Sequence, residues 1–224
     1  MRAVTTVRVL AADVDRMRGS RGGLVRLLRE VGADVALLHR VPTHPASGHR
    51  LGALGSDVGL LVGAGGRDSG GAAVFTTLRV EPTATTVFRG AGGGLALVTA
   101  RLTGGQQLRF ATVDARGDDA DQAALAAHLV SLVGAPDGVP TVVAGPLPGT
   151  AAGDTLARRF PDLTPGAAPT APAGEPRTRP LGLLGVDVRA AALPLPGEPG
   201  RRPALLARVL PSRPTLLEVT LDPS

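Results

Sequence analysis

The sequence predicts an α/β protein built as a four-layer α/β/β/α sandwich, in which two packed mixed sheets lie between outer helices. Three observations lead to this fold class. A strand–helix–strand unit opens the chain, a series of short strands follows, and a helix–strand–helix segment leads into late strands. The 224 residues, 43% of them apolar, fit one domain over residues 1–224 with a sizeable core.

The opening unit has the clearest periodicity. Val4–Ala12 is rich in aliphatic and β-branched residues and predicts a buried strand. Ser20 is a suitable N-cap for a helix that ends near Val31, and Asp34–Val41 predicts the next strand. A strand–helix–strand crossover of this kind favours parallel pairing. The helix carries apolar residues at i, i+3, i+4 and i+7, namely Leu24, Leu27, Leu28 and Val31.

The middle of the chain predicts antiparallel strands, because Gly-rich or polar turns separate most of the short apolar runs. A helix then begins near Asp118, where acidic residues favour a helix N-terminus, and runs to about Val133. The predicted strands are Val58–Val62, Ala72–Leu78, Val80–Phe88, Leu95–Leu102 and Gln107–Asp114.

The last third is less regular. Thr141–Gly145 predicts a buried strand and Asp154–Phe160 a short helix, while Thr164–Pro180 is rich in Pro, Ala, Gly and Thr and predicts an exposed, mobile loop. The late strands are Leu183–Leu193, Ala204–Leu210 and Thr215–Leu221.

Composition excludes several kinds of chemistry. The chain has no Cys, so disulfides and thiolate catalysis are impossible, and no Lys, so a phosphate-binding P-loop is ruled out. The joint absence of Lys, Asn, Ile and Tyr indicates a very GC-rich coding sequence, as in a GC-rich bacterium. A net charge of +5 over a whole domain is weak support for nucleic-acid binding. We find neither a signal peptide nor a membrane-spanning stretch and expect a cytoplasmic protein.

Three histidines invite a metal hypothesis. His39, His44 and His49 are evenly spaced, but Pro42 and Pro45 prevent one helix from aligning them, and no acidic or thiolate residue accompanies them. We therefore favour ordinary surface or strand-end histidines over a zinc site.

A series of short segments resembles a known family over nearly the whole chain. In order they are V-R-V-L-A-A-D-V (7–14), A-L-L-H-R-V-P (36–42), G-G-A-A-V-F-T (70–76), L-R-F-A-T-V-D-A (108–115), V-V-A-G-P-L-P (142–148) and L-P-S-R-P-T (210–215). Their order and spacing resemble the motifs of the endonuclease/exonuclease/phosphatase superfamily. The resemblance implies the four-layer sandwich, and it implies hydrolysis of phosphate esters with Mg²⁺ or a similar divalent ion wherever the motifs are intact.

The motifs are altered at the positions that carry this chemistry. By the resemblance, Asp13 stands in place of an Asn that helps bind metal or phosphate, Arg40 in place of the metal-binding Glu, and Asp114 in place of a His. Pro146 and Pro148 replace the Asp base and an Asn.

The final motif is altered as well. Pro211 and Ser212 replace an Asp–His pair, whereas Arg213 keeps the family residue. Asp187 is a candidate remnant of another family motif. We expect a degenerate pocket made by Asp13, His39, Arg40, Asp114, Pro146, Pro148, Ser212 and Arg213.

These changes predict a protein without a metal cofactor that acts by binding rather than by hydrolysis. Mg²⁺ requires oxygen ligands, and a permanent cation at Arg40 repels it. We predict instead that Arg40 forms an ion pair with Asp13. Asp114 is able to share the same arginine. A protein, a nucleic acid or a phosphate-type anion held by Arg40 and Arg213 is a possible partner, and a membrane is not. The alternative is a divergent phosphoesterase or nuclease that holds Mg²⁺ or Mn²⁺ between Asp13 and Asp114.

Overall fold

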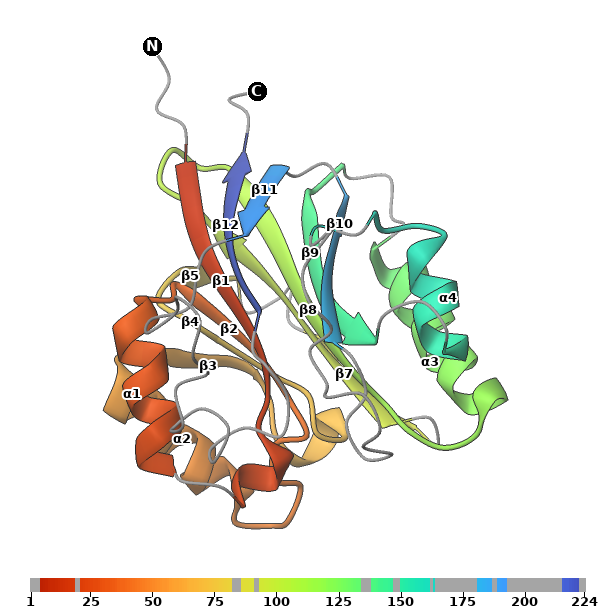
Figure 1. The fold of residues 1–224 in the computed structure, drawn as a ribbon, viewed down its shortest axis with the longest axis horizontal. Coiled ribbons are helices and arrows are strands. Elements are labelled where there is room, and N and C mark those ends of the chain that lie inside the picture. Colours follow the sequence, from red (N-terminus) through yellow and green to blue (C-terminus); the bar gives the residue numbers. More distant parts are fainter. Residues whose placement is uncertain are drawn as a thin grey trace, which may run out of the picture.

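The first of two sheets contains the strand–helix–strand unit (Figure 1). In the computed structural model, β1 (Thr5–Asp13) and β2 (Val35–His39) pair in parallel and are joined through α1 (Arg21–Val31). The parallel pairing confirms the prediction from the sequence. The predicted apolar stripe of α1 is buried, because it packs on the outer face of this sheet. The structure describes residues 5–18, 21–81, 86–90, 93–133, 138–146, 150–161, 163, 181–186, 189–192 and 215–221.

The remaining strands of the first sheet are antiparallel to their neighbours. Its order is β11-β12-β1-β2-β4-β3. The four further strands are β3 (Leu61–Gly65), β4 (Ala73–Thr76), β11 (Arg189–Ala192) and β12 (Thr215–Leu221).

The second sheet has the order β10-β9-β8-β7-β5, with β6 also paired to β7. Only β8 and β9 are parallel, and α3 (Asp119–Val133) connects them. The strands are β5 (Arg79–Val80), β6 (Thr86–Gly90), β7 (Gly93–Arg101), β8 (Gln107–Ala115), β9 (Thr141–Pro146) and β10 (Leu181–Val186).

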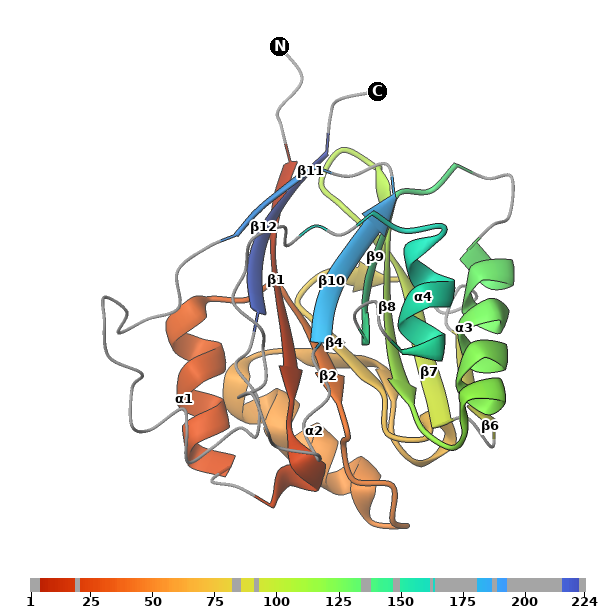
Figure 2. The ribbon, with the colours of Figure 1, turned by 45° about the vertical axis from the view of Figure 1, so that its right-hand side comes forward.

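Three apolar layers hold the sheets and helices together, which confirms the four-layer sandwich. The central layer lies between the sheets and includes Val9, Leu37, Val98 and Phe110, all fully buried. A second layer lies beneath α1 and α2 (Ser47–Val58), and a third beneath α3 and α4 (Ala151–Ala157). Figure 2 shows the two helix pairs on opposite sides of the sheets. Within the described part of the chain, no helix is long and apolar enough to cross a membrane.

One helix was not predicted, and the bounds of the strand predicted after it are wrong. The segment expected as strand Val58–Val62 begins with the last residue of α2, and β3 starts only at Leu61. Glycines within α2 hide the helix from a propensity argument. Burial of Leu51 and Leu54 stabilises it instead.

Other boundaries also differ from the prediction. The strand expected over Val80–Phe88 is divided between β5 and β6, and the one over Leu183–Leu193 between β10 and β11. The expected loop Thr164–Pro180, the expected strand Ala204–Leu210 and the expected cap Ser20 lie outside the described residues.

Two glycines in α2 give a matched test of its packing. A methyl group at Gly55 would lie 2.5 Å from the carbonyl oxygen of Leu60, whereas one at Gly52 would meet nothing within 4 Å. Gly55→Ala is expected to lower the free energy of unfolding by about 1–3 kcal/mol, because backbone has to move. Gly52→Ala, the control, is expected to raise it by about 0.5–1 kcal/mol. Urea unfolding measures both, and equal effects would contradict this packing.

Candidate functional site

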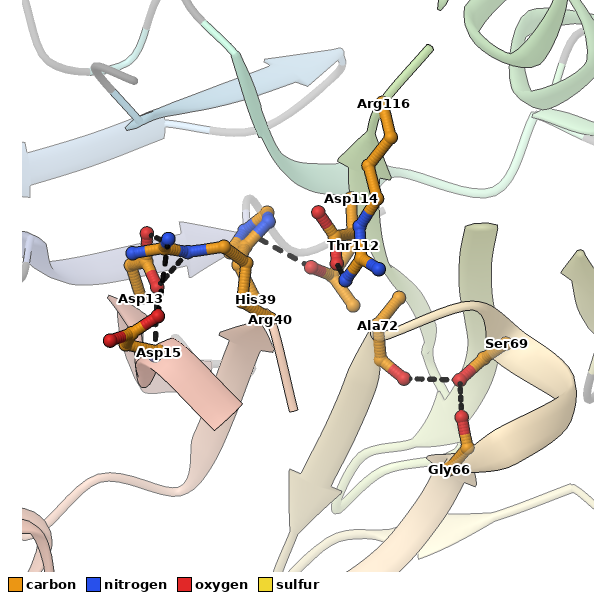
Figure 3. Close-up of polar contacts among 10 residues, drawn as sticks. All are labelled: Asp13, Asp15, His39, Arg40, Gly66, Ser69, Ala72, Thr112, Asp114 and Arg116. Carbon is orange, nitrogen blue, oxygen red and sulfur yellow. Dashed lines mark hydrogen bonds and ion pairs between the residues drawn. The ribbon is translucent and has the colours of Figure 1, made fainter. Parts of the chain in front are cut away.

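Polar residues from three strands converge where these strands end (Figure 3). Asp13 ends β1 and lies in register with His39, which ends β2. Asp114 comes from β8 of the other sheet and is one residue from its end. We call Asp13, His39, Arg40 and Asp114 the strand-end site. All four belong to the predicted set, so topology brings together residues that are distant in the sequence.

Asp13 and Arg40 form the predicted ion pair. The Arg40 Nε lies 2.7 Å from both carboxylate oxygens of Asp13. One N–H of Arg40 is therefore shared between the two carboxylate oxygens. The carboxylate also accepts a hydrogen bond from the backbone N–H of Asp15 at 3.0 Å, and the Arg40 Nη1 lies 3.3 Å from the carboxylate of Asp15. Burial alone would lower the pKa of Arg40, but the hydrogen bond and the charge of Asp13 outweigh it, so this pKa is raised.

The backbone around this pair is held in an uncommon conformation. Arg40 has φ +52°, and the short helix η1 (Asp15–Met17) has positive φ at all three of its residues. These are the only described non-glycine residues in that region, where each costs on the order of 1–3 kcal/mol. The N–H of Arg16 donates to the carbonyl of Arg40 at 2.5 Å, and the N–H of Val14 donates to that of His39 at 3.0 Å. The two turns thus fix each other and aim Arg40 at Asp13.

Asp114 has its own partner, Arg116, and does not share Arg40. The Arg116 Nη2 donates directly to Oδ2 of Asp114. The turn after η2 (Arg67–Ser69) passes close to this second pair, and a methyl group at Gly71 would overlap both side chains. The G-G-A-A-V-F-T motif therefore has a steric reason for its second glycine, which also has φ +114°. The sequence contained one signal for Arg116, since it stands two residues after Asp114, directly beyond the end of β8, where a continuing strand would place both side chains on one face.

His39 lies between the two ion pairs and is 2% exposed (Figure 3). Its Nε2 is 3.1 Å from the Oγ1 of Thr112, so this hydrogen bond links the two sheets. Burial lowers the pKa of His39, although the charges of Asp114 and Asp13 oppose the shift. His39 is therefore neutral at pH 7. Since His44 and His49 are exposed, the three histidines do not gather at one place.

The acidic residues of the site are a poor fit to a divalent metal as they are arranged. Both oxygens of Asp13 contact Arg40, and Asp114 is held by Arg116. Mg²⁺ favours several oxygen ligands, and two guanidinium groups beside the carboxylates repel it. Among the described residues, no group of three or more His, Asp or Glu side chains is placed to hold a metal ion.

Part of the predicted pocket lies beyond what the structure describes. Pro146 ends β9 and pairs with Leu181 of β10, so its backbone belongs to the second sheet. Pro148, Ser212 and Arg213 lie outside the described residues, as does Asp187. Their place at the site stays a prediction.

The fold matches that of solved proteins of the endonuclease/exonuclease/phosphatase family. The endonuclease/exonuclease/phosphatase from Bacteroides vulgatus superimposes with a TM-score of 0.71 at 13% identity, over 97% of this chain and 100% of that chain. The human Nocturnin catalytic domain with bound sulfate anion gives 0.68 at 12%, over 97% and 95%. Danio rerio TDP2 complexed with a single-strand DNA product gives 0.66 at 14%, over 98% and 100%.

The comparisons confirm the fold predicted from the motifs, and at these identities they establish the fold alone. No protein-family model matches the chain. No curated protein matches it significantly in sequence.

The Asp13–Arg40 pair is testable by its contribution to stability. Arg40→Gln leaves a buried carboxylate without its cation and is expected to lower the free energy of unfolding by about 2–3 kcal/mol. The double change Arg40→Gln with Asp13→Asn is expected to cost less, because no charge is left alone. Arg101→Gln, which breaks an exposed pair with Glu81, is the control and should lower the free energy of unfolding much less than Arg40→Gln. A double variant less stable than the single one in urea unfolding would contradict this account.

The buried His39 makes stability depend on pH. The pKa of His39 in the folded state lies below the ordinary value of 6.5. The stabilisation that the neutral, buried imidazole gives the fold is therefore complete above about pH 6.5, and it is lost as the pH falls below that value. The unfolded chain then binds a proton that the folded chain does not, and the slope approaches at most about 1.4 kcal/mol per pH unit. Urea unfolding from pH 7.5 to 5 should show this decline in the parent chain and a flatter profile in His39→Gln. His49→Gln, an exposed control on α2, should keep the parent's slope.

Proposed function

We propose that this chain is a non-hydrolytic protein with the endonuclease/exonuclease/phosphatase fold, and that it acts by binding. The observation that carries the proposal is the pairing of Arg40 with the buried Asp13. By the motif resemblance, this arginine occupies the position of the metal-binding Glu. A fixed cation therefore compensates Asp13 where an active relative would use a divalent ion.

At the described motif positions, the residues present do not suit the chemistry of phosphate-ester hydrolysis. A divalent ion polarises the phosphate and activates water in such enzymes. A guanidinium carries charge but does not lower the pKa of a bound water molecule in that way. Pro146, at the position of the Asp base, has no group that accepts a proton. His39 is buried and held by Thr112, so it does not replace that base at the surface.

Binding remains available to such a site. Two proteins of the same fold are seen with anions, since TDP2 holds a single-strand DNA product and Nocturnin a sulfate. A protein, a nucleic acid and a phosphate-type anion are the partner classes that we consider for this chain. The opposing function, a divergent phosphoesterase with Mg²⁺ or Mn²⁺ between Asp13 and Asp114, would first have to displace Arg40 and Arg116.

The test is a hydrolysis assay with the purified chain. We expect no turnover of DNA, RNA, sugar phosphates or bis(p-nitrophenyl) phosphate with Mg²⁺ or Mn²⁺ present. Melting temperature should also be unchanged by either ion, because a specific ligand would raise it. Turnover that EDTA abolishes, and that Asp13→Ala also abolishes, would overturn the proposal in favour of the divergent phosphoesterase.

A further inference from the structure

The outward face of α3 carries no charge along most of its length. Beyond the first turn, its exposed residues are Ala124, Ala127 and Ser131. A helix that faces water normally has charged or strongly polar residues on that side. The chain contains 24 arginines and no lysine, yet residues 122–133 include none of them. On α1, which covers the other sheet, the exposed positions are mostly charged and include Arg21, Arg26, Arg29 and Glu30.

Phe88 of β6 extends this uncharged surface on one side of α3. Phe88 is 36% exposed, and its ring lies against the imidazole of His128 with the ring centroids 4.6 Å apart. An aromatic side chain on a surface without charged residues is typical of the centre of a protein–protein interface. We call this surface the α3 face, and it consists of Ala120, Ala124, Ala127, Ser131 and Phe88.

The charges around the α3 face are separated by sign along the helix. Because α3 and α4 follow the parallel strands β8 and β9, both helices begin near the same edge of the second sheet. Asp119 and Asp121 lie in the first turn of α3, and Asp154 lies in the first turn of α4. Arg158 and Arg159 directly follow α4 and are exposed. Since α4 lies alongside α3 (Figure 2), one end of this layer is acidic and the arginines lie toward the other end.

From this arrangement we propose that the α3 face binds the same face of a second copy of this chain. A twofold axis across the middle of α3 makes each copy contribute the same patch and sets the two helices antiparallel. Asp119 and Asp121 of one copy then lie toward Arg158 and Arg159 of the other, twice in the dimer. A parallel arrangement would bring like charges together, so the charge pattern selects the antiparallel one.

The small side chains of the α3 face suit this packing, because the distance between two packed helices depends on the side chains at their contact. The inference concerns a surface outside the strand-end site and therefore does not rest on the proposed binding function.

The experiment measures the dissociation constant of the dimer by analytical ultracentrifugation over a range of chain concentrations. The parent chain is expected to dimerise, and added salt should weaken the dimer because it screens the complementary charges. Ala124→Glu should weaken the dimer at least about tenfold, since the twofold axis brings the two introduced charges close together. Gly52→Glu, at a position of α2 with nothing within 4 Å, is the control and should leave the dissociation constant unchanged.

Two charge-reversed variants distinguish this dimer from any other. The first carries Asp119→Arg and Asp121→Arg, and the second carries Arg158→Asp and Arg159→Asp. Each alone should dimerise at least about tenfold more weakly, because both ends of its α3 face then have the same sign. An equimolar mixture should recover a dimer within about threefold of the parent, since the ends of one variant complement those of the other. Asp118 is left intact, because its Oδ1 accepts a hydrogen bond from the backbone N–H of Asp121 at 2.9 Å.

Several outcomes would overturn the inference. A parent chain that stays monomeric up to the limit of its solubility is one, and equal effects of Ala124→Glu and Gly52→Glu are another. Circular dichroism checks that the charge-reversed variants are folded. Folded variants that both dimerise like the parent, or that lose the dimer without recovering it in the mixture, would overturn the inference as well. If a reversed variant is unfolded, the comparison of Ala124→Glu with Gly52→Glu decides.

Discussion

Two carboxylates buried at the strand ends set the main constraint on this structure. A buried charge is costly unless it is paired and hydrogen-bonded, and both Asp13 and Asp114 are at most 5% exposed. Each of the two carboxylates is paired with a guanidinium group. The local backbone is arranged to bring these cations into place, through the left-handed residue at Arg40 and the bare backbone of Gly71.

The same constraint connects the site to the sandwich. Parallel pairing of β1 and β2 places Asp13 opposite His39, and the packing of the sheets places Thr112 of β8 against that histidine. The neutral imidazole is a polar link between sheets that share an apolar central layer. A protonated His39 would lie between both ion pairs. It would add a third cation to a buried region in which two guanidinium groups already balance two carboxylates. Keeping His39 neutral therefore protects the packing and both pairs.

Most of the fold could be predicted from the sequence, because α1 has a clear apolar stripe, acidic residues mark the start of α3, and turns separate most of the apolar strand segments. The helix α2 could not, since its glycines oppose helix propensity and its stability comes from Leu51 and Leu54 packing beneath it. The Asp13–Arg40 pair was predictable because both residues align with motif positions that meet at one sheet edge. Arg116 was missed because it lies after the motif, and the Gly71 backbone that packs against the Asp114–Arg116 pair comes from a distant segment of the chain.

Compensation by arginine differs physically from compensation by a metal ion. A bound metal ion exchanges with the solution, so the charge of a metal site depends on the ion concentration. The open coordination positions of the ion bind water or substrate. A guanidinium is covalently attached and always charged, so the strand-end site is balanced at any ion concentration. It also has no open coordination position, and its remaining capacity is a set of N–H donors with fixed directions. A site balanced in this way has no means to activate water but keeps N–H donors that hold an oxyanion, so the proposed absence of hydrolysis and the proposed binding function are compatible in one site.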